Sequence, residues 1–412
     1  MIGVASDLTH SAELIDHRCR DPLKDSIQRH RCQEQGHSDG NCFEHDRREA
    51  KDGVGEMKAL RYYGPKDLRI DEIEEPEVRE GHVKIQVQWC GICGTDLHEY
   101  LGGPILIPGS ENPHPLTGES LPVTMGHEFT GIVVEIGEGV EGFAVGDSVI
   151  VEPTLRDHTC YQCRRGAHNL CPQIGFYGLS GLGGGLAEYA VIDARNLYVL
   201  PESVPTDVGV LIDPLVVAWQ AMRDSGYKPG DTALVVGAGP IGLALLLTLK
   251  ASGARWVGLS EIAESRKEQA VAFGADAVFD PRQVDVAEQV REHTDGLGAH
   301  VAFDASGLPQ TLETAIHAVR PEGTVFNVAI WEEPVAIDMN LLVMGGKKIA
   351  STLAFADVHT SVIAALADAR IRPADMITKR VALEDVIEDG FEELIRNKDE
   401  HIKIIVSPSG LA

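Results

Sequence analysis

Residues 233–250 read ALVVGAGPIGLALLLTLK, two apolar runs joined by a glycine-rich junction. The apolar run at 233–236 predicts a buried strand, and the run at 241–250 predicts the helix after it. Three glycines at the junction have the G-x-G-x-x-G spacing, in which the first allows a tight turn, the second admits a pyrophosphate and the third lets helix pack on strand. Because the helix N-terminus points free N–H groups at phosphates, we predict a dinucleotide-binding turn. Its predicted cofactor-binding residues are Gly237, Gly239, Pro240, Ile241 and Gly242.

An acidic residue, Glu261, lies about 20 residues after the glycine-rich turn, the separation at which dinucleotide-binding proteins have a carboxylate. Glu261 follows the next apolar run, 256–259, and a carboxylate there accepts hydrogen bonds from the adenosine ribose hydroxyls. It also repels a 2′-phosphate, so the sequence favours NAD over NADP. Arg266 complicates this choice, because a nearby arginine accommodates a 2′-phosphate. The alternative is that Glu261 is a solvated surface residue.

Apolar strands and helical stretches alternate around this turn, which predicts a parallel, doubly wound sheet. Before it, short β-like runs between glycines and prolines predict a mostly β domain. The strands predicted outside the turn lie at 83–87, 130–136, 148–152, 186–192, 256–259, 301–304, 324–328 and 402–406. The predicted helices lie at 263–273, 310–319, 358–369 and 383–397. We divide the chain at these changes of pattern into 1–56, 57–206, 207–350 and 351–412.

Residues 1–56 differ from the rest, with three of the 8 cysteines, five of the 16 histidines and few apolar residues in any regular period. This composition predicts a poorly ordered extension. No pair of its cysteines has the Cys-x2-Cys spacing of zinc modules, which disfavours a metal site there. Alternatively, the native protein begins near Met57, and a mass spectrum of that protein distinguishes the two readings.

Acidic residues dominate the 412-residue chain, with 63 Asp and Glu against 36 Lys and Arg and a formal charge of −27. Such a surface disfavours nucleic acid, whose binding relies on Lys and Arg, and anionic membranes. It suits either an ordinary acidic enzyme or one that works in concentrated salt, where screening weakens self-repulsion. Residues 1–30 lack the apolar core of a secretory signal. We therefore expect a cytoplasmic protein whose cysteines are thiols or metal ligands.

Two further stretches of the sequence contain side chains that can bind a metal ion. Residues 90–98 read CGICGTDLH, and residues 126–128 read GHE. A catalytic zinc keeps three protein ligands and one open position, and Cys93 with His127 supplies two of them. Singly, a buried cysteine and a core histidine are common. Together with a dinucleotide-binding turn, they predict a catalytic metal site.

With these motifs, residues 57 to about 408 resemble the zinc-dependent medium-chain dehydrogenases, in the branch of the 2,3-butanediol dehydrogenases near sorbitol dehydrogenase. The residues that favour this branch are TDLHEYLGGPILI at 95–107 and the endings GFEEL at 390–394 and HIK at 401–403. The resemblance implies an α/β fold in which a GroES-like, mostly β catalytic domain joins a Rossmann domain that binds NAD. The segment 351–412 then returns to the catalytic domain.

The activity implied is hydride transfer between NAD and a secondary alcohol or vicinal diol, with 2,3-butanediol and acetoin as the expected pair. Other polyols and threonine are the alternatives within the family. A non-catalytic dinucleotide-binding protein is the alternative outside it, but such a protein would have no reason to keep the metal-binding side chains together. Relatives are dimers or tetramers, so we expect a homo-oligomer.

The resemblance also assigns the zinc ligands. Cys93 and His127 take the positions of the family's cysteine and histidine, and Glu128 either joins the metal or stands just behind it. The remaining ligand in relatives is a glutamate, for which this chain has Asp213. Aspartate is one methylene shorter, so either a water bridges the gap or Glu128 takes the place.

Two residues of the same stretch would carry the proton of the alcohol. By family precedent, the hydroxyl of Thr95 receives this proton and the imidazole of His98 hands it to solvent. Alternatively, His98 and its neighbour Asp96 are ordinary surface loop residues.

A second cysteine set matches the last three members of the four-cysteine lobe that holds a structural zinc in many relatives. These members are Cys160, Cys163 and Cys171. The first member would fall on Asp157, with His158 beside it. Aspartate oxygen binds zinc, so a site of three cysteines with either Asp or His stays open beside a metal-free lobe.

Overall fold

The computed structural model of the chain describes residues 55–331 and 333–410. The extension predicted at 1–56 lies outside the described residues, apart from its last two. Within these ranges, no helix has the length and apolar character needed to span a bilayer.

The first part of the described chain forms two sheets of mostly antiparallel strands. β3 (His82–Gly91) is the central strand of the larger one, and its side chains alternate between buried and partly exposed. It pairs with both β5 (Glu128–Ile136) and β9 (Tyr189–Asp193). The remaining strands here are β1 (Glu56–Gly64), β2 (Asp67–Glu74), β4 (Val123–Thr124), β6 (Ser148–Val151) and β10 (Leu197–Val199).

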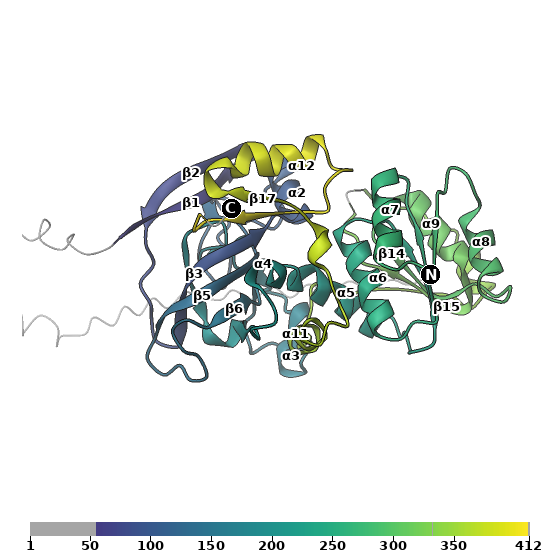
Figure 1. The fold of residues 1–412 in the computed structure, drawn as a ribbon, viewed down its shortest axis with the longest axis horizontal. Coiled ribbons are helices and arrows are strands. Elements are labelled where there is room, and N and C mark those ends of the chain that lie inside the picture. Colours follow the sequence, from purple (N-terminus) through teal and green to yellow (C-terminus); the bar gives the residue numbers. More distant parts are fainter. Residues whose placement is uncertain (1–54, 332, 411–412) are drawn as a thin grey trace, which may run out of the picture. The chain divides into compact units, whose positions relative to one another are not determined.

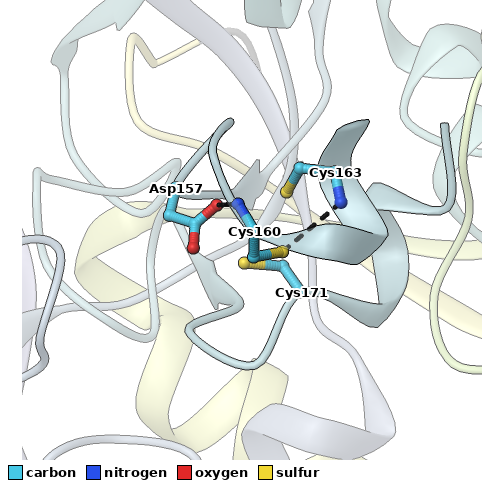
Figure 2. A group of neighbouring side chains, drawn as sticks. All are labelled: Asp157, Cys160, Cys163 and Cys171. Atoms are coloured by element: carbon cyan, nitrogen blue, oxygen red, sulfur yellow. Dashed lines mark hydrogen bonds between the residues drawn. The ribbon is translucent and has the colours of Figure 1, made fainter. Parts of the chain in front are cut away.

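A loop-rich lobe leaves this region between the short strands β7 (Thr154–Leu155) and β8 (Gly175–Phe176). It contains the helical turns α3 (Tyr161–Arg164) and η1 (His168–Leu170) and four polar side chains that gather around one loop (Figure 2). Asn169 donates a hydrogen bond of 2.7 Å from Nδ2 to the carbonyl of Leu353. The lobe is therefore tied to a segment far along the chain.

The second part is a six-stranded parallel sheet in the order β13-β12-β11-β14-β15-β16. Helices surround its strands, as Figure 1 shows for α6, α7, α8 and α9. The chain runs outward from β11 in both directions, so the carboxyl end of β11 is the topological switch point where such sheets bind ligands. The strands are β11 (Thr232–Val236), β12 (Trp256–Ser260), β13 (Ala277–Phe279), β14 (Ala299–Asp304), β15 (Val319–Asn327) and β16 (Lys348–Ser351). The helices are α6 (Pro240–Ala251), α7 (Glu264–Ala272), α8 (Val286–Glu292), α9 (Pro309–Ala318) and α10 (Asn340–Val343).

After β16 the chain returns to the first sheet through α11 (His359–Ala367) and β17 (Ile377–Ala382). The last strand, β18 (Lys403–Ser407), pairs with β17 and with β3, where Ile405 lies opposite Gly91. β18 thereby lies beside the stretch that contains Cys93.

The single helix predicted at 383–397 is wrong. The structure has a 3-10 turn, η4 (Leu383–Asp385), a π-helix, η5 (Val386–Glu392), and a short α-helix, α12 (Glu393–Arg396). Gly390 lies so close to the core that an added Cβ would come within 2.7 Å of Ile92 Cδ1. The wider π-helical turn therefore occurs where the backbone packs closely against Ile92, a contact that no local sequence pattern could indicate.

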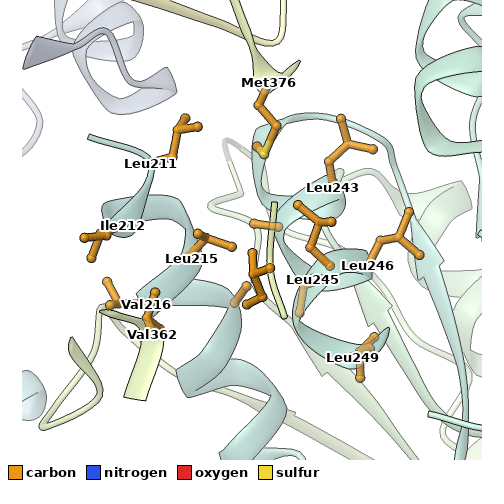
Figure 3. Close-up of a cluster of buried hydrophobic side chains, with 14 of the residues drawn as sticks. Leu211, Ile212, Leu215, Val216, Leu243, Leu245, Leu246, Leu249, Val362 and Met376 are labelled. Atoms are coloured by element: carbon orange, nitrogen blue, oxygen red, sulfur yellow. The ribbon is translucent and has the colours of Figure 1, made fainter. Parts of the chain in front are cut away.

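A helix that the sequence did not predict, α5 (Ile212–Asp224), lies at the centre of the largest core cluster. It packs against α6 and α11, and Figure 3 shows Leu215 and Leu245 among the leucine, valine and methionine side chains that fill the space. Pro214, Val216 and Val217 near its start have low helix propensity, so local composition did not favour a helix here.

A buried carboxylate joins α11 to the first sheet. Glu152, 1% exposed, accepts hydrogen bonds from Thr154 Oγ1 at 2.6 Å, Arg156 Nη1 at 2.8 Å and the hydroxyl of Tyr198 at 3.0 Å. His359 of α11 stacks on Tyr198, with ring centroids 4.6 Å apart, and its Nδ1 lies 3.7 Å from Glu152 Oε2.

This cluster predicts a loss of stability in acid. Burial lowers the pKa of His359 to about 4, against the opposing effect of Glu152. The unfolded chain, with a histidine pKa of about 6.5, therefore binds the proton more readily, and the folded state loses about 2 kcal/mol between about pH 7.5 and about pH 5. Denaturant unfolding at both pH values should show this loss in the wild type and a smaller one in His359→Gln. The exposed His317→Gln is the matched control, and equal losses in all three proteins would refute the prediction.

Candidate metal centres and cofactor-binding turn

The first candidate centre begins at a helix cap. α2 (Gly94–Gly102) starts after Cys93, whose backbone N–H donates to Asp96 Oδ2 at 2.9 Å. The other oxygen, Oδ1, lies 3.3 Å from Nδ1 of His127. Asp96 is fully buried, so its interpretation as a surface loop residue is wrong. The Cys-x-x-Asp spacing is that of a capping box, which is the signal that could have identified Asp96.

Three predicted ligands come together here. One ligand atom each from Cys93, His127 and Glu128 lies within 4.8 Å of the other two. Adjacent strands hold them there, because Gly91 at the end of β3 pairs with Glu128 at the start of β5. A Cβ at Gly91 would come within 2.2 Å of Glu128 Oε2. Only glycine at position 91 therefore leaves room for the Glu128 carboxylate.

The surroundings of this group favour a positive charge. Burial alone would lower the pKa of His127, but Asp96 and Cys93 outweigh it and hold the pKa well above its usual value. A soft thiol, an imidazole and a carboxylate are also the donor set that zinc accepts. The residues present therefore fit a zinc ion.

Asp213 lies outside this group. It stands in the first turn of α5, 7% exposed, and burial together with the nearby charge of Glu128 raises its pKa to about 7. Of the two carboxylates that the sequence left open, Glu128 is therefore the one that lies beside the thiol and the imidazole.

A buried lysine that sequence reasoning missed completes the surroundings. Lys403 of β18 is 2% exposed and places Nζ 2.6 Å from Glu128 Oε2 and 3.3 Å from the carbonyl of Ile92. Burial lowers the pKa of Lys403, but Glu128 and Cys93 raise it by more, so it stays above its usual range. No local pattern indicated this burial, because a lysine is rarely buried unless it is paired and its partner Glu128 lies 275 positions away.

The predicted proton-relay residues occupy one face of α2. The hydroxyl of Thr95 lies 3.7 Å from Cys93 Sγ. His98 follows three residues later, which puts it on the same face, and it is exposed where Thr95 is partly buried. The two side chains therefore lead from the candidate centre toward solvent.

The second candidate centre is in the lobe, where ligand atoms of Asp157, Cys160, Cys163 and Cys171 all lie within 4.8 Å of one another (Figure 2). Asp157, and not its neighbour His158, is the fourth member. Asp157 Oδ1 accepts from the backbone N–H of Cys160 at 2.8 Å, which fixes the carboxylate at the loop. Burial and the two neighbouring thiols raise the pKa of Cys163 to about 12. Three thiols and a carboxylate fit a structural zinc.

The glycine-rich turn has the geometry that the sequence predicted. Gly237 has φ +102°, and a Cβ on Gly242 would come within 1.9 Å of the Gly237 carbonyl. A Cβ on Gly239 would meet nothing within 4 Å, so space is left at the helix start where a pyrophosphate approaches. These residues fit a dinucleotide. Pro240 is the first residue of α6, followed by Ile241.

The two side chains predicted near the adenosine ribose differ in their surroundings. Glu261 is 8% exposed, and its carboxylate accepts from the N–H groups of Ala238 at 2.8 Å and Ile262 at 2.7 Å. It is therefore not a solvated surface residue. Arg266 donates instead to the carbonyl of Lys398, in the loop before β18.

Comparisons with known proteins agree with this arrangement. Two family models match: "Alcohol dehydrogenase GroES-like domain" at residues 79–202 and "Zinc-binding dehydrogenase" at residues 240–368. The (R,R)-butanediol dehydrogenase of Bacillus subtilis (strain 168) is 44% identical over 353 residues, 86% of this chain and 100% of the relative. The L-threonine 3-dehydrogenase of Pyrococcus horikoshii is 38% identical over 291 residues, 71% of this chain and 80% of the relative. The crystal structure of the 2R,3R-butanediol dehydrogenase from Bacillus subtilis has a TM-score of 0.81 and covers 86% of this chain and 100% of its own.

These matches confirm the family and the α/β fold class that the sequence predicted, a GroES-like domain joined to a Rossmann-like parallel sheet. Membership of this family also explains why one chain combines a dinucleotide-binding turn with a metal-binding group. That group is formed by Cys93, His127 and Glu128, close to the hydroxyl of Thr95. The chain belongs to the zinc-dependent medium-chain alcohol dehydrogenases, enzymes that move a hydride between an alcohol and a nicotinamide cofactor.

Proposed function

We propose that this enzyme interconverts a vicinal diol and its acyloin, with 2,3-butanediol and acetoin as the pair, at a zinc held by Cys93, His127 and Glu128. The observation that carries the proposal is the grouping of these three ligand atoms within 4.8 Å, in a chain 44% identical to a butanediol dehydrogenase over that relative's full length. We assign catalysis to 57–206 with 351–412, and cofactor binding to 207–350.

The test is a panel of alcohols measured under one set of conditions. We expect kcat/KM for (R,R)-2,3-butanediol to exceed that for sorbitol and threonine by at least about a hundredfold, which corresponds to about 2.7 kcal/mol of transition-state discrimination. If sorbitol or threonine were oxidised far faster, the substrate assignment would be overturned while the family assignment stood.

Three residues of the chain have separate roles in the proposed reaction. Bound zinc supplies a Lewis acid that lowers the pKa of an alcohol hydroxyl, and bound NAD supplies the hydride acceptor. Asp96, 3.3 Å from Nδ1 of His127, orients the imidazole so that Nε2 is left for the metal. Thr95 receives the alcohol proton beside Cys93, and His98 passes it to solvent.

The arrangement around Glu261 supports NAD over NADP. Its carboxylate lies directly after β12 and accepts from Ala238 of the glycine-rich turn, and nearby cations are occupied by other partners. Arg282, which donates to the carbonyl of Ile262, pairs with Asp280 at 2.6 Å, and Arg266 donates to Lys398.

Glu261→Gln should relax this preference, because glutamine keeps one acceptor oxygen and loses the charge. We expect the ratio of kcat/KM for NAD to that for NADP to fall at least tenfold, or about 1.4 kcal/mol. The matched control is Glu264→Gln, an exposed carboxylate on α7. An unchanged ratio in Glu261→Gln would show that this charge does not select the cofactor.

We propose a second zinc in the lobe, held by Asp157, Cys160, Cys163 and Cys171, which makes two per subunit. The convergence of their ligand atoms within 4.8 Å supports it. Both sites need reduced thiols, and this supports the cytoplasmic location predicted from the sequence.

We also propose that the enzyme is a homodimer joined at β16. This strand ends the parallel sheet, and an edge strand offers unpaired backbone groups to a second copy. Next to it, the apolar side chains of Val343 and Met344 are 72% and 89% exposed. A two-fold axis at this edge would bury both copies of this surface against each other.

Met344→Glu should therefore shift the protein from dimer to monomer in sedimentation equilibrium, because two carboxylates would meet near the axis. Val271→Glu, on the exposed surface of α7, is the matched control and should remain dimeric. A wild type that sediments as a monomer would exclude the dimer.

A further inference from the structure

The ammonium group of Lys403 connects the two segments that supply the candidate metal ligands. Its Nζ lies 2.6 Å from Glu128 Oε2 and 3.3 Å from the carbonyl of Ile92. Glu128 directly follows His127, and Ile92 directly precedes Cys93. The backbone of β18 adds a second link, because Ile404 accepts from the N–H of Ile92 at 3.0 Å.

The charges on these groups conflict when a metal is bound. Both partners of the Lys403–Glu128 pair have only 2% of their side chains exposed, and a buried carboxylate without a counterion is strongly unfavourable. In the metal-free site, Lys403 is that counterion. When a divalent cation binds, Glu128 gains a second positive partner, and the ammonium and the metal repel each other across a short distance.

We propose that Lys403 is a positioning residue that sets the zinc affinity of the Cys93–His127–Glu128 site by sharing Glu128 with the metal. The inference rests on the proposed function, because it takes zinc as the ion of this site. Lys403 holds the site together before the metal enters and weakens the metal's hold afterwards. Zinc at this site is thereby more exchangeable than its three protein ligands alone would make it.

The experiment compares zinc affinity between Lys403→Met and the wild type by competition with a chromophoric chelator. Methionine removes the charge and keeps an unbranched side chain of similar length. We expect zinc to bind at least tenfold more tightly to the variant, and the difference in melting temperature between metal-free and zinc-loaded protein to widen. Lys403→Arg, which keeps the charge, should return the affinity toward that of the wild type.

Two controls isolate the site. Lys379→Met removes an exposed ammonium paired with Asp389 at 2.8 Å on the neighbouring strand β17, and it should leave zinc affinity unchanged. Cys93→Ala reports zinc bound in the lobe alone, so its binding isotherm is subtracted from the others. If Lys403→Met is too unstable without metal, Co²⁺-loaded protein is prepared and the rate of Co²⁺ loss to the chelator is followed by its visible absorption, which should be slower than in the wild type.

The outcomes separate this inference from the proposed function. Equal or weaker metal binding by Lys403→Met, in a protein whose wild type binds zinc through Cys93, would refute the role of Lys403 and leave the function intact. Equal zinc binding by the wild type and Cys93→Ala would refute the proposed metal site itself. In a Glu128→Gln background the effect of Lys403→Met should shrink, and an undiminished effect would show that Lys403 does not act through Glu128.

Discussion

Cys93→Ala should lower kcat/KM for the diol by about a thousandfold or more and remove one zinc per subunit. The thiolate is the soft ligand of the group formed with His127 and Glu128. Lewis-acid stabilisation by a metal contributes several kcal/mol to the transition state, and about 4 kcal/mol corresponds to a factor of roughly a thousand in rate. The measurement pairs steady-state kinetics with elemental analysis of the same samples.

Cys90→Ala is the matched control for this result. Cys90 is three residues away and fully buried, and burial raises the pKa of its thiol, so it remains a protonated core side chain. We expect the control to keep both its zinc and its turnover. Turnover in a wild type stripped of all metal would show that Cys93 and His127 have been misinterpreted.

Cys163→Ser should remove the other zinc and destabilise the protein by about 5 kcal/mol or more. Structural zinc contributes roughly 10 kcal/mol or more of binding free energy to small folded units, and the lobe between β7 and β8 has little regular structure of its own. Melting temperature and zinc content are measured together. Asp157→Cys should have the opposite effect and retain zinc at higher chelator concentrations, because it supplies a fourth thiolate.

The kinetic consequence distinguishes this site from the first. Since the lobe's ligands are a separate group from Cys93, His127 and Glu128, Cys163→Ser should keep most of its turnover at temperatures where it remains folded. A single zinc in the wild type, with no change in melting temperature for Cys163→Ser, would mean that the lobe is metal-free.

Local sequence patterns predicted the parts of the structure that local chemistry determines. The glycine turn and the strand and helix around it follow from steric rules that act within a few residues, as the φ of Gly237 and the tight approach at Gly242 show. The metal-binding groups also have local spacing, so Cys93, His127 and the lobe cysteines were identifiable. α5 was missed because Pro214, Val216 and Val217 give its start a low helix propensity.

The parts that could not be predicted depend on contacts between distant residues. Lys403 and Glu128 are 275 positions apart, and no pattern around either residue names the other. Asp96 was left open as a surface loop residue; its cap at Cys93 is a local pattern, but its full burial and its approach to His127 depend on residues distant in the sequence. The π-helical turn at 386–392 likewise reflects the packing of Gly390 against Ile92. Residues 1–54 lie outside the described structure, so the extension stays a prediction.

The position of β18 has a consequence for how the protein is made. The strand that provides Lys403 leaves the ribosome some three hundred codons after Cys93 and Glu128. Domains fold as they are synthesised, but this site is incomplete until β18 has left the ribosome. A nascent chain therefore carries the thiol, imidazole and carboxylate without their internal cation, and a prematurely terminated product would present an unfinished metal site to the cell's quality control.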